Sequence, residues 1–233
     1  MGQSLEFIKD RALKTTSAAE QLAPVWIWQE KTPAQMSALL VAITGNRAVD
    51  PPVVGQEEIT SQAEQTMLHA RGLWDAGLDQ LHRWTLQGVG MAKNRFRNNP
   101  PQAAQLDGLT AKGDSRAATL KEALDWESAW ANVDPAWAPL PANTLAAFRA
   151  LRKQCLEDLQ DAYADGFAAW SKDAKKLGQM ARDLEDVNEA WYADALRVFP
   201  AGTPEGDLIR GTIPTTYNPP SAKPTPPPPP PTA

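Results

Sequence analysis

Two histidines are the side chains of this chain best suited to acid–base or metal chemistry. His69 and His82 are the only histidines, and their thirteen-residue separation turns them to different directions on a shared helix. Asp79 lies three residues before His82, but a carboxylate-bridged dimetal bundle requires Glu-x-x-His motifs on two helices and further glutamates. The second half of the chain contains no histidine. The sequence therefore predicts no metal site and no bound cofactor.

The single cysteine, Cys155, is a poor candidate for a catalytic nucleophile. It lies between Leu151 and Leu159 on an apolar helical stripe, a position typical of an inert core thiol. The sequence contains no GxSxG elbow, no Walker A loop and no strand-borne GxGxxG motif. We therefore expect no catalytic residues and no enzymatic activity.

Nine tryptophans are the most unusual feature of the composition. Trp74, Trp170 and Trp191 fall on helical stripes, which predicts that they belong to the core. The candidate interaction residues are instead the tryptophans and prolines around two connectors, namely Trp26, Trp28, Trp126, Trp130, Pro135, Trp137 and Pro139. These tryptophans either close the ends of a helical bundle or form exposed platforms for a protein or a sugar, and burial is the favoured alternative.

The last twenty residues have a different composition from the rest of the chain. Residues 214–233 are rich in Pro, Thr, Asn and Ser, and they include the proline run Pro226, Pro227, Pro228, Pro229, Pro230 and Pro231. Because proline fixes φ and removes a backbone donor, this segment is expected to be an extended polyproline II tail. It is either a terminus without a partner or a segment that docks on an aromatic surface of another copy.

Composition and charge narrow the class of protein. Of the 233 residues 42% are hydrophobic and 22% charged, which is ordinary globular usage. The formal net charge of -5 argues against a nucleic-acid partner. The sequence shows neither a signal peptide nor an apolar run long enough to span a bilayer, so we expect no membrane insertion and a cytoplasmic location by default. Export without a recognisable signal stays open.

Apolar spacing predicts helices along most of the chain. The predicted helices are residues 4–22, 33–43, 59–96 and 115–131, followed by a stripe over 145–198 that is expected to break or kink between Trp170 and Gly178. Gly88 and Gly90 weaken the third helix, so a kink or a close helix crossing is expected there. Prolyl helix starts follow at Pro100 and Pro204.

Several landmarks recur in the same order, which predicts an internal duplication. The proposed equivalent pairs are Trp28 with Trp130, Pro33 with Pro135, and Phe96 with Phe199. The predicted fold is all-α, an antiparallel helical bundle made of two diverged repeats with an extended proline-rich tail. The predicted boundaries are 1–112 for repeat 1, 113–213 for repeat 2 packed with it as one bundle, and 214–233 for the tail.

These features favour a non-enzymatic structural or interaction protein. It would act as a helical subunit or scaffold whose partner is another copy or a different protein, and it would self-assemble through the Trp/Pro surfaces and the tail. The alternative is a ligand-binding or enzymatic bundle with a pocket between its helices.

Overall fold

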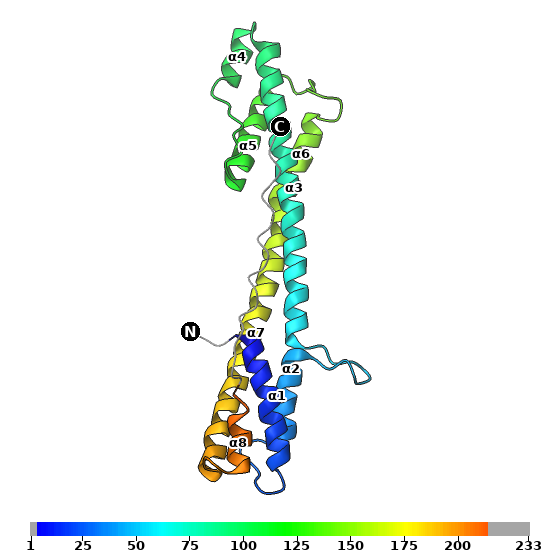
Figure 1. The fold of residues 1–233 in the computed structure, drawn as a ribbon. Helices are drawn as coiled ribbons and strands as arrows, with labels where there is room; N and C mark the ends of the chain where they lie inside the picture. The colour runs from blue at the N-terminus through cyan, green and yellow to red at the C-terminus, as the bar shows by residue number, and fades with distance from the viewer. Residues whose placement is uncertain (1–3, 214–233) are drawn as a thin grey trace, which may run out of the picture. The chain divides into compact units, whose positions relative to one another are not determined.

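The computed structural model describes residues 4–213, so the predicted tail lies outside the described residues. Within that range the protein is all-α, as predicted, and holds no strand. The elements, in chain order, are α1 (Leu5–Leu22), α2 (Pro33–Thr44), α3 (Gln56–Phe96), α4 (Pro100–Leu106), α5 (Arg116–Val133), α6 (Leu145–Gln154), the π-helical turn η1 (Cys155–Leu159), α7 (Gln160–Val198) and α8 (Pro204–Arg210) (Figure 1).

Short polar side chains define where the helices begin. In each case the hydroxyl accepts a hydrogen bond from the backbone amide three residues on, which satisfies one of the free donors of the first turn. The residues with this role are Ser4, Thr32, Ser115, Thr144 and Thr203. At α2 the Gln35 side chain also accepts from the Thr32 amide at 2.8 Å, which completes a capping box.

The chain divides into two compact units that are discontinuous in sequence. Unit 1 extends to Glu58 and resumes at Lys175, whereas unit 2 is Ile59–Ala174. The predicted boundaries at 112 and 113 do not coincide with these units. The reason is that α3 and α7 each contribute to both units, so each unit combines helices from both predicted repeats.

Unit 1 contains α1, α2, the later part of α7, and α8. Figure 1 shows α1 and α2 side by side in this unit. Its buried residues form two apolar clusters, one around Met36, Trp191 and Ile209 and the other around Ile43 and Leu184.

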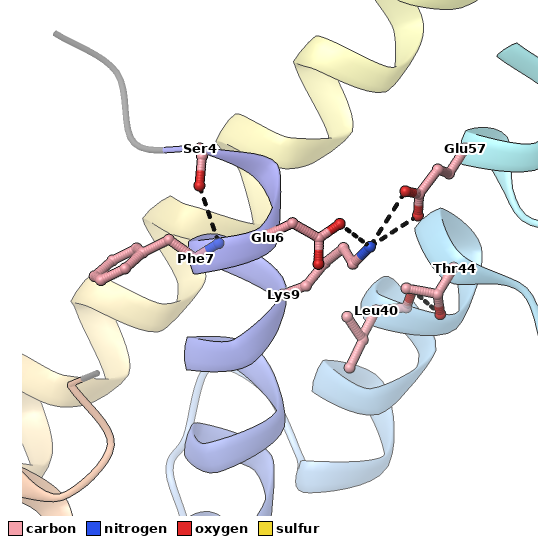
Figure 2. A network of polar contacts seen from close by, with 7 residues as sticks. All are labelled: Ser4, Glu6, Phe7, Lys9, Leu40, Thr44 and Glu57. Atoms are coloured by element: carbon pink, nitrogen blue, oxygen red, sulfur yellow. Dashed lines mark hydrogen bonds and ion pairs between the residues drawn. The ribbon is translucent and has the colours of Figure 1, made fainter. Parts of the chain in front are cut away.

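Lys9 joins α1 to the first turn of α3 within unit 1. Its ammonium donates to Glu6 at 2.7 Å and to both carboxylate oxygens of Glu57 at 3.0 and 3.2 Å (Figure 2). Partial burial alone would lower the pKa of Lys9, but the two carboxylates favour the charged form and raise this pKa above its ordinary 10.5. The contact therefore fixes the start of the long helix α3 against α1.

Unit 2 is centred on a tryptophan that fills the space left by a glycine. The Trp126 side chain of α5 is fully buried, and a Cβ atom placed on Gly88 of α3 would lie 2.7 Å from its ring. The close crossing predicted at this glycine is thus confirmed. Trp126 also stacks on Trp130, with ring centroids 5.1 Å apart.

Further along unit 2, α3 packs against the π-helical turn and α7 in the same large-against-small manner. A Cβ on Gly77 would lie 2.9 Å from Leu159 and 3.0 Å from the Cys155 sulfur. A Cβ on Gly166 of α7 would lie 3.2 Å from the backbone of Met67. Glycines on both partners thus allow the two backbones to approach closely.

Of the break or kink predicted between Trp170 and Gly178, the break is wrong. Helix α7 continues through those residues, and the irregularity lies earlier, in the π-helical turn η1. A π turn accommodates an extra residue in the helical repeat, and here it coincides with the packing of Cys155 against Gly77.

The segment between α4 and α5 is held against its neighbours by Glu122. The Glu122 carboxylate accepts hydrogen bonds from the Lys112 and Gly113 amides at 3.0 and 3.1 Å and from the Thr110 hydroxyl at 3.3 Å. Lys93 of α3 donates to the Leu109 carbonyl at 3.0 Å. Residues 109–113 therefore return along α5 after α4 ends.

The elements of the first half recur in the second half. Helices α1 and α5 are both 18 residues long, α3 and α7 are 41 and 39, and α4 and α8 are both 7. Each buried residue of α5 lies 111 positions after a buried residue of α1, the set being Thr119, Ala123, Trp126, Ala129, Trp130 and Val133. Each buried residue of α7 lies 103 positions after a buried residue of α3, the set being Leu184, Asn188, Trp191 and Ala195. This recurrence is what an internal duplication would produce.

The register of that recurrence differs from the predicted tryptophan pair. Because α1 ends at Leu22 and α5 at Val133, the shift of 111 positions matches Trp26 with Trp137, and not Trp28 with Trp130. The error arises because Trp130 lies inside α5, whereas Trp28 lies in the connector that follows α1.

The predicted proline pair does not correspond either. Pro33 is the first residue of α2, whereas Pro135 lies in the connector after α5, well before α6 begins. Phe96 and Phe199 do match at the shift of 103, since Phe96 ends α3 and Phe199 directly follows α7.

We expect Gly88→Ala to lower the free energy of unfolding by about 1–3 kcal/mol, because the added methyl group overlaps the immobile Trp126 ring. Gly90→Ala is the matched control. It meets no atom within 4 Å and should stabilise the helix by up to about 1 kcal/mol. Urea unfolding followed by circular dichroism measures both, and equal effects of the two variants would contradict the packing described.

Glu122→Gln tests the connector between α4 and α5. Burial alone would raise the pKa of Glu122, but its hydrogen bonds with the Lys112 and Gly113 amides and the Thr110 hydroxyl lower it below the ordinary 4.5. The charged carboxylate therefore contributes stability above pH 4.5, and this contribution disappears as the pH falls through the lowered pKa.

We expect Glu122→Gln to destabilise the protein by about 1 kcal/mol at pH 7 and by less below pH 4. Urea titrations at the two pH values give the difference. The exposed carboxylate Glu64 in the same unit supplies the control, since Glu64→Gln should change stability by less than about 0.5 kcal/mol at either pH. A Glu122→Gln effect that is independent of pH would contradict the role of the charge.

Candidate interaction surfaces

Most of the predicted connector tryptophans lie in the core. Trp126 and Trp130 are each 1% exposed, and Trp28 is also buried. The Trp130 indole donates to the Trp137 carbonyl at 2.9 Å, and the Trp28 indole donates to the Asp194 carboxylate at 3.0 Å. These three side chains close the aromatic clusters of their units and offer no exposed platform.

Trp26 and Trp137 are half-buried at matching places in the two units. Trp26 meets Phe199 edge-on at 6.1 Å, and Trp137 meets Phe96 edge-on at 5.5 Å. In unit 2 the Arg95 guanidinium also lies 5.8 Å from the Trp137 ring centroid. Each ring thus covers the phenylalanine at the end of a long helix.

Two of the predicted interaction prolines lie within the described residues. Pro135 is exposed and Pro139 is half-buried in the connector between α5 and α6. The run Pro226, Pro227, Pro228, Pro229, Pro230 and Pro231 lies outside the described residues.

The structure reveals an exposed aromatic surface on α7 that sequence reasoning missed. Tyr163, Phe167 and Trp170 follow one another along one face of α7, with centroids 6.3 Å apart for the first pair and 5.6 Å for the second. We call these three residues the aromatic ladder. Phe167 is 46% exposed, and the apolar core of unit 2 extends to Tyr163 but to neither of the other two rings. The i, i+4, i+7 spacing was visible in the sequence, but it was interpreted as a core stripe.

The inner end of the aromatic ladder is anchored. Tyr163 stacks on the buried Trp74 at 5.5 Å, and the Arg116 guanidinium lies 4.4 Å from the Trp74 ring centroid. Arg116 in turn donates to the Asp75 carboxylate at 2.6 and 2.9 Å. The ladder therefore begins on an ordered cation–π and ion-pair arrangement and extends to the exposed Phe167 and the half-buried Trp170.

A second surface feature is an open hollow between α1 and α8 in unit 1. It measures about 400 Å³ and is lined by Leu13, Lys14, Ser17, Ala18, Gln21, Leu208, Gly211 and Thr212. We call it the α1/α8 hollow. Its lining combines leucine and alanine side chains with hydroxyl and amide groups.

The described side chains show little that would support redox, metal or thiol chemistry. Cys155 is buried, and burial raises the pKa of its thiol, which disfavours the nucleophilic thiolate. Across residues 4–213, no group of three or more His, Cys, Asp or Glu side chains is placed to hold a metal ion. Among the described helices, none combines the length and apolar character needed to cross a bilayer.

Comparison with known proteins gives no relative: no protein-family model, no curated protein and no solved structure matches this chain.

Proposed function

We propose that this chain is a non-enzymatic structural protein that assembles by binding a proline-rich segment on its aromatic ladder. The bound segment is the run Pro226–Pro231 of a second copy. The observation that carries this proposal is the exposure of Phe167 between two further rings on one helical face.

The spacing of the aromatic ladder suits a polyproline II segment. Tyr163 and Trp170 are seven residues apart on α7, which separates them by about 10.5 Å along the helix axis. A polyproline II helix repeats every three residues, or about 9.3 Å. Prolines three apart therefore present their rings at nearly the spacing of the two outer aromatic residues, Tyr163 and Trp170.

Both partners are suited to binding with little loss of conformational entropy. A run of six prolines favours polyproline II, and a chain restricted to this conformation loses little entropy on binding. Aromatic rings bury a large area with few rotatable bonds. Because each copy carries both a ladder and a proline run, contacts between copies are head-to-tail, as heterologous interfaces are.

We expect the full-length protein to show a concentration-dependent increase in mass above 25.4 kDa in sedimentation equilibrium. Replacing Pro226–Pro231 by serine keeps the chain length but removes the polyproline conformation, and Phe167→Ala removes the central ring. Each change should weaken the association at least tenfold, as expected for the loss of an aromatic anchor.

Leu156→Ala is the matched control, because Leu156 is a similarly exposed apolar residue of the same unit outside the ladder. It should leave the association unchanged. A native chain that stays monomeric at all concentrations, or an association that survives both the serine and the alanine substitutions, would refute the proposal.

A further inference from the structure

We propose that the α1/α8 hollow is the seat of the chain's own residues 214–218, Pro-Thr-Thr-Tyr-Asn, which follow α8 directly. This inference concerns unit 1 and does not depend on the proposed function of the aromatic ladder. It assigns an anchored start to a tail whose composition alone predicts a free one.

The described chain ends at the edge of this hollow. Gly211 and Thr212 form part of its lining, and Pro214 is only two residues further on. Thr212 is buried, and its hydroxyl donates to the Ile209 carbonyl at 2.7 Å, so the exit point is fixed on α8. The residue before a proline is disfavoured in the helical conformation, so Ile213 is expected to end the helical path of α8.

The lining of the hollow suits an extended segment with one aromatic residue. Leu13, Ala18 and Leu208 provide apolar contacts. The Leu13 side chain is 59% exposed, so it is available to a further segment of the chain. Ser17 and Gln21 provide hydroxyl and amide groups that can pair with the peptide groups of a passing chain. A volume of about 400 Å³ is within the range that encloses a ligand of several groups. Tyr217 is the one residue of the segment able to fill its apolar part.

Unit 2 contains a segment at the matching place in the chain. Residues 109–113, which come after α4, lie 103 positions before residues 212–216, which come after α8. In unit 2 this segment turns back over α5, where Leu109 packs against the core and Glu122 binds the Lys112 and Gly113 amides. The helix that matches α5 in unit 1 is α1, which forms one wall of the hollow.

The residue that holds the segment in unit 2 is replaced in unit 1. The position that matches Glu122 is occupied by Arg11, which is buried and lies 3.6 Å from Glu189. An arginine cannot accept hydrogen bonds from backbone amides. Residues 214–218 would therefore need a different binding site on α1. The α1/α8 hollow, which lies beside Leu13 and Ser17, provides one.

Hydrogen exchange of the full-length chain tests this inference. In the native protein we expect the amides of residues 215–218 to exchange at least tenfold more slowly than an unstructured peptide of the same sequence. Ser17→Trp should fill the hollow and restore the unstructured rate. Tyr217→Ser should do the same from the side of the segment, and because it lies outside the described helices its result does not depend on whether Ser17→Trp folds.

Ser128→Trp is the matched control, since Ser128 is the exposed serine of α5 that lies 111 positions after Ser17. It should leave the protection of residues 215–218 intact. Exchange at the unstructured rate in the native chain, or protection that persists in Tyr217→Ser, would overturn the inference. Protection that is lost on dilution would also overturn it, because the hollow would then bind the segment of a second copy.

Discussion

The approach of large side chains to glycines is the constraint on which unit 2 depends. Trp126 occupies the space above Gly88, Cys155 and Leu159 pack on Gly77, and Met67 packs on Gly166. Each glycine weakens its own helix by about 1 kcal/mol relative to alanine, so its presence requires a compensating contact. The compensation is close packing between helices, which buries a full indole ring and a cysteine of the apolar core.

The two units meet the same packing requirement with the large and small residues exchanged. The position that matches Trp126 is Thr15, and the position that matches Gly88 is Trp191. These four residues are all buried. Each unit therefore has one large ring at this pair of matching positions. In unit 2 the ring is contributed by α5, and in unit 1 by α7. Such exchange conserves core volume while the sequence diverges.

The helices could be predicted from the sequence because their signals are local. Ser4, Thr32 and Pro204 mark helix starts, and apolar spacing follows the long helices to within a few residues. The division into units could not be predicted, since it depends on which part of α3 and α7 packs with which short helices. The sequence also could not predict which residues of an apolar stripe are exposed to solvent. Phe167 continues the same apolar stripe as Trp74's partner Tyr163, and nothing in the spacing shows that the core ends between them.

The residues of α3 that match the aromatic ladder of α7 indicate which ladder residues the fold requires to be apolar. The residues of α3 that match Tyr163, Phe167 and Trp170 are Thr60, Glu64 and Met67. Met67 is buried, so an apolar residue at this level belongs to the packing of the two long helices. Glu64 is exposed, so the scaffold accepts a charged side chain at the position where α7 has Phe167. A phenylalanine ring at that position is thus not required by the packing of the two long helices, which supports the proposal that a partner covers it.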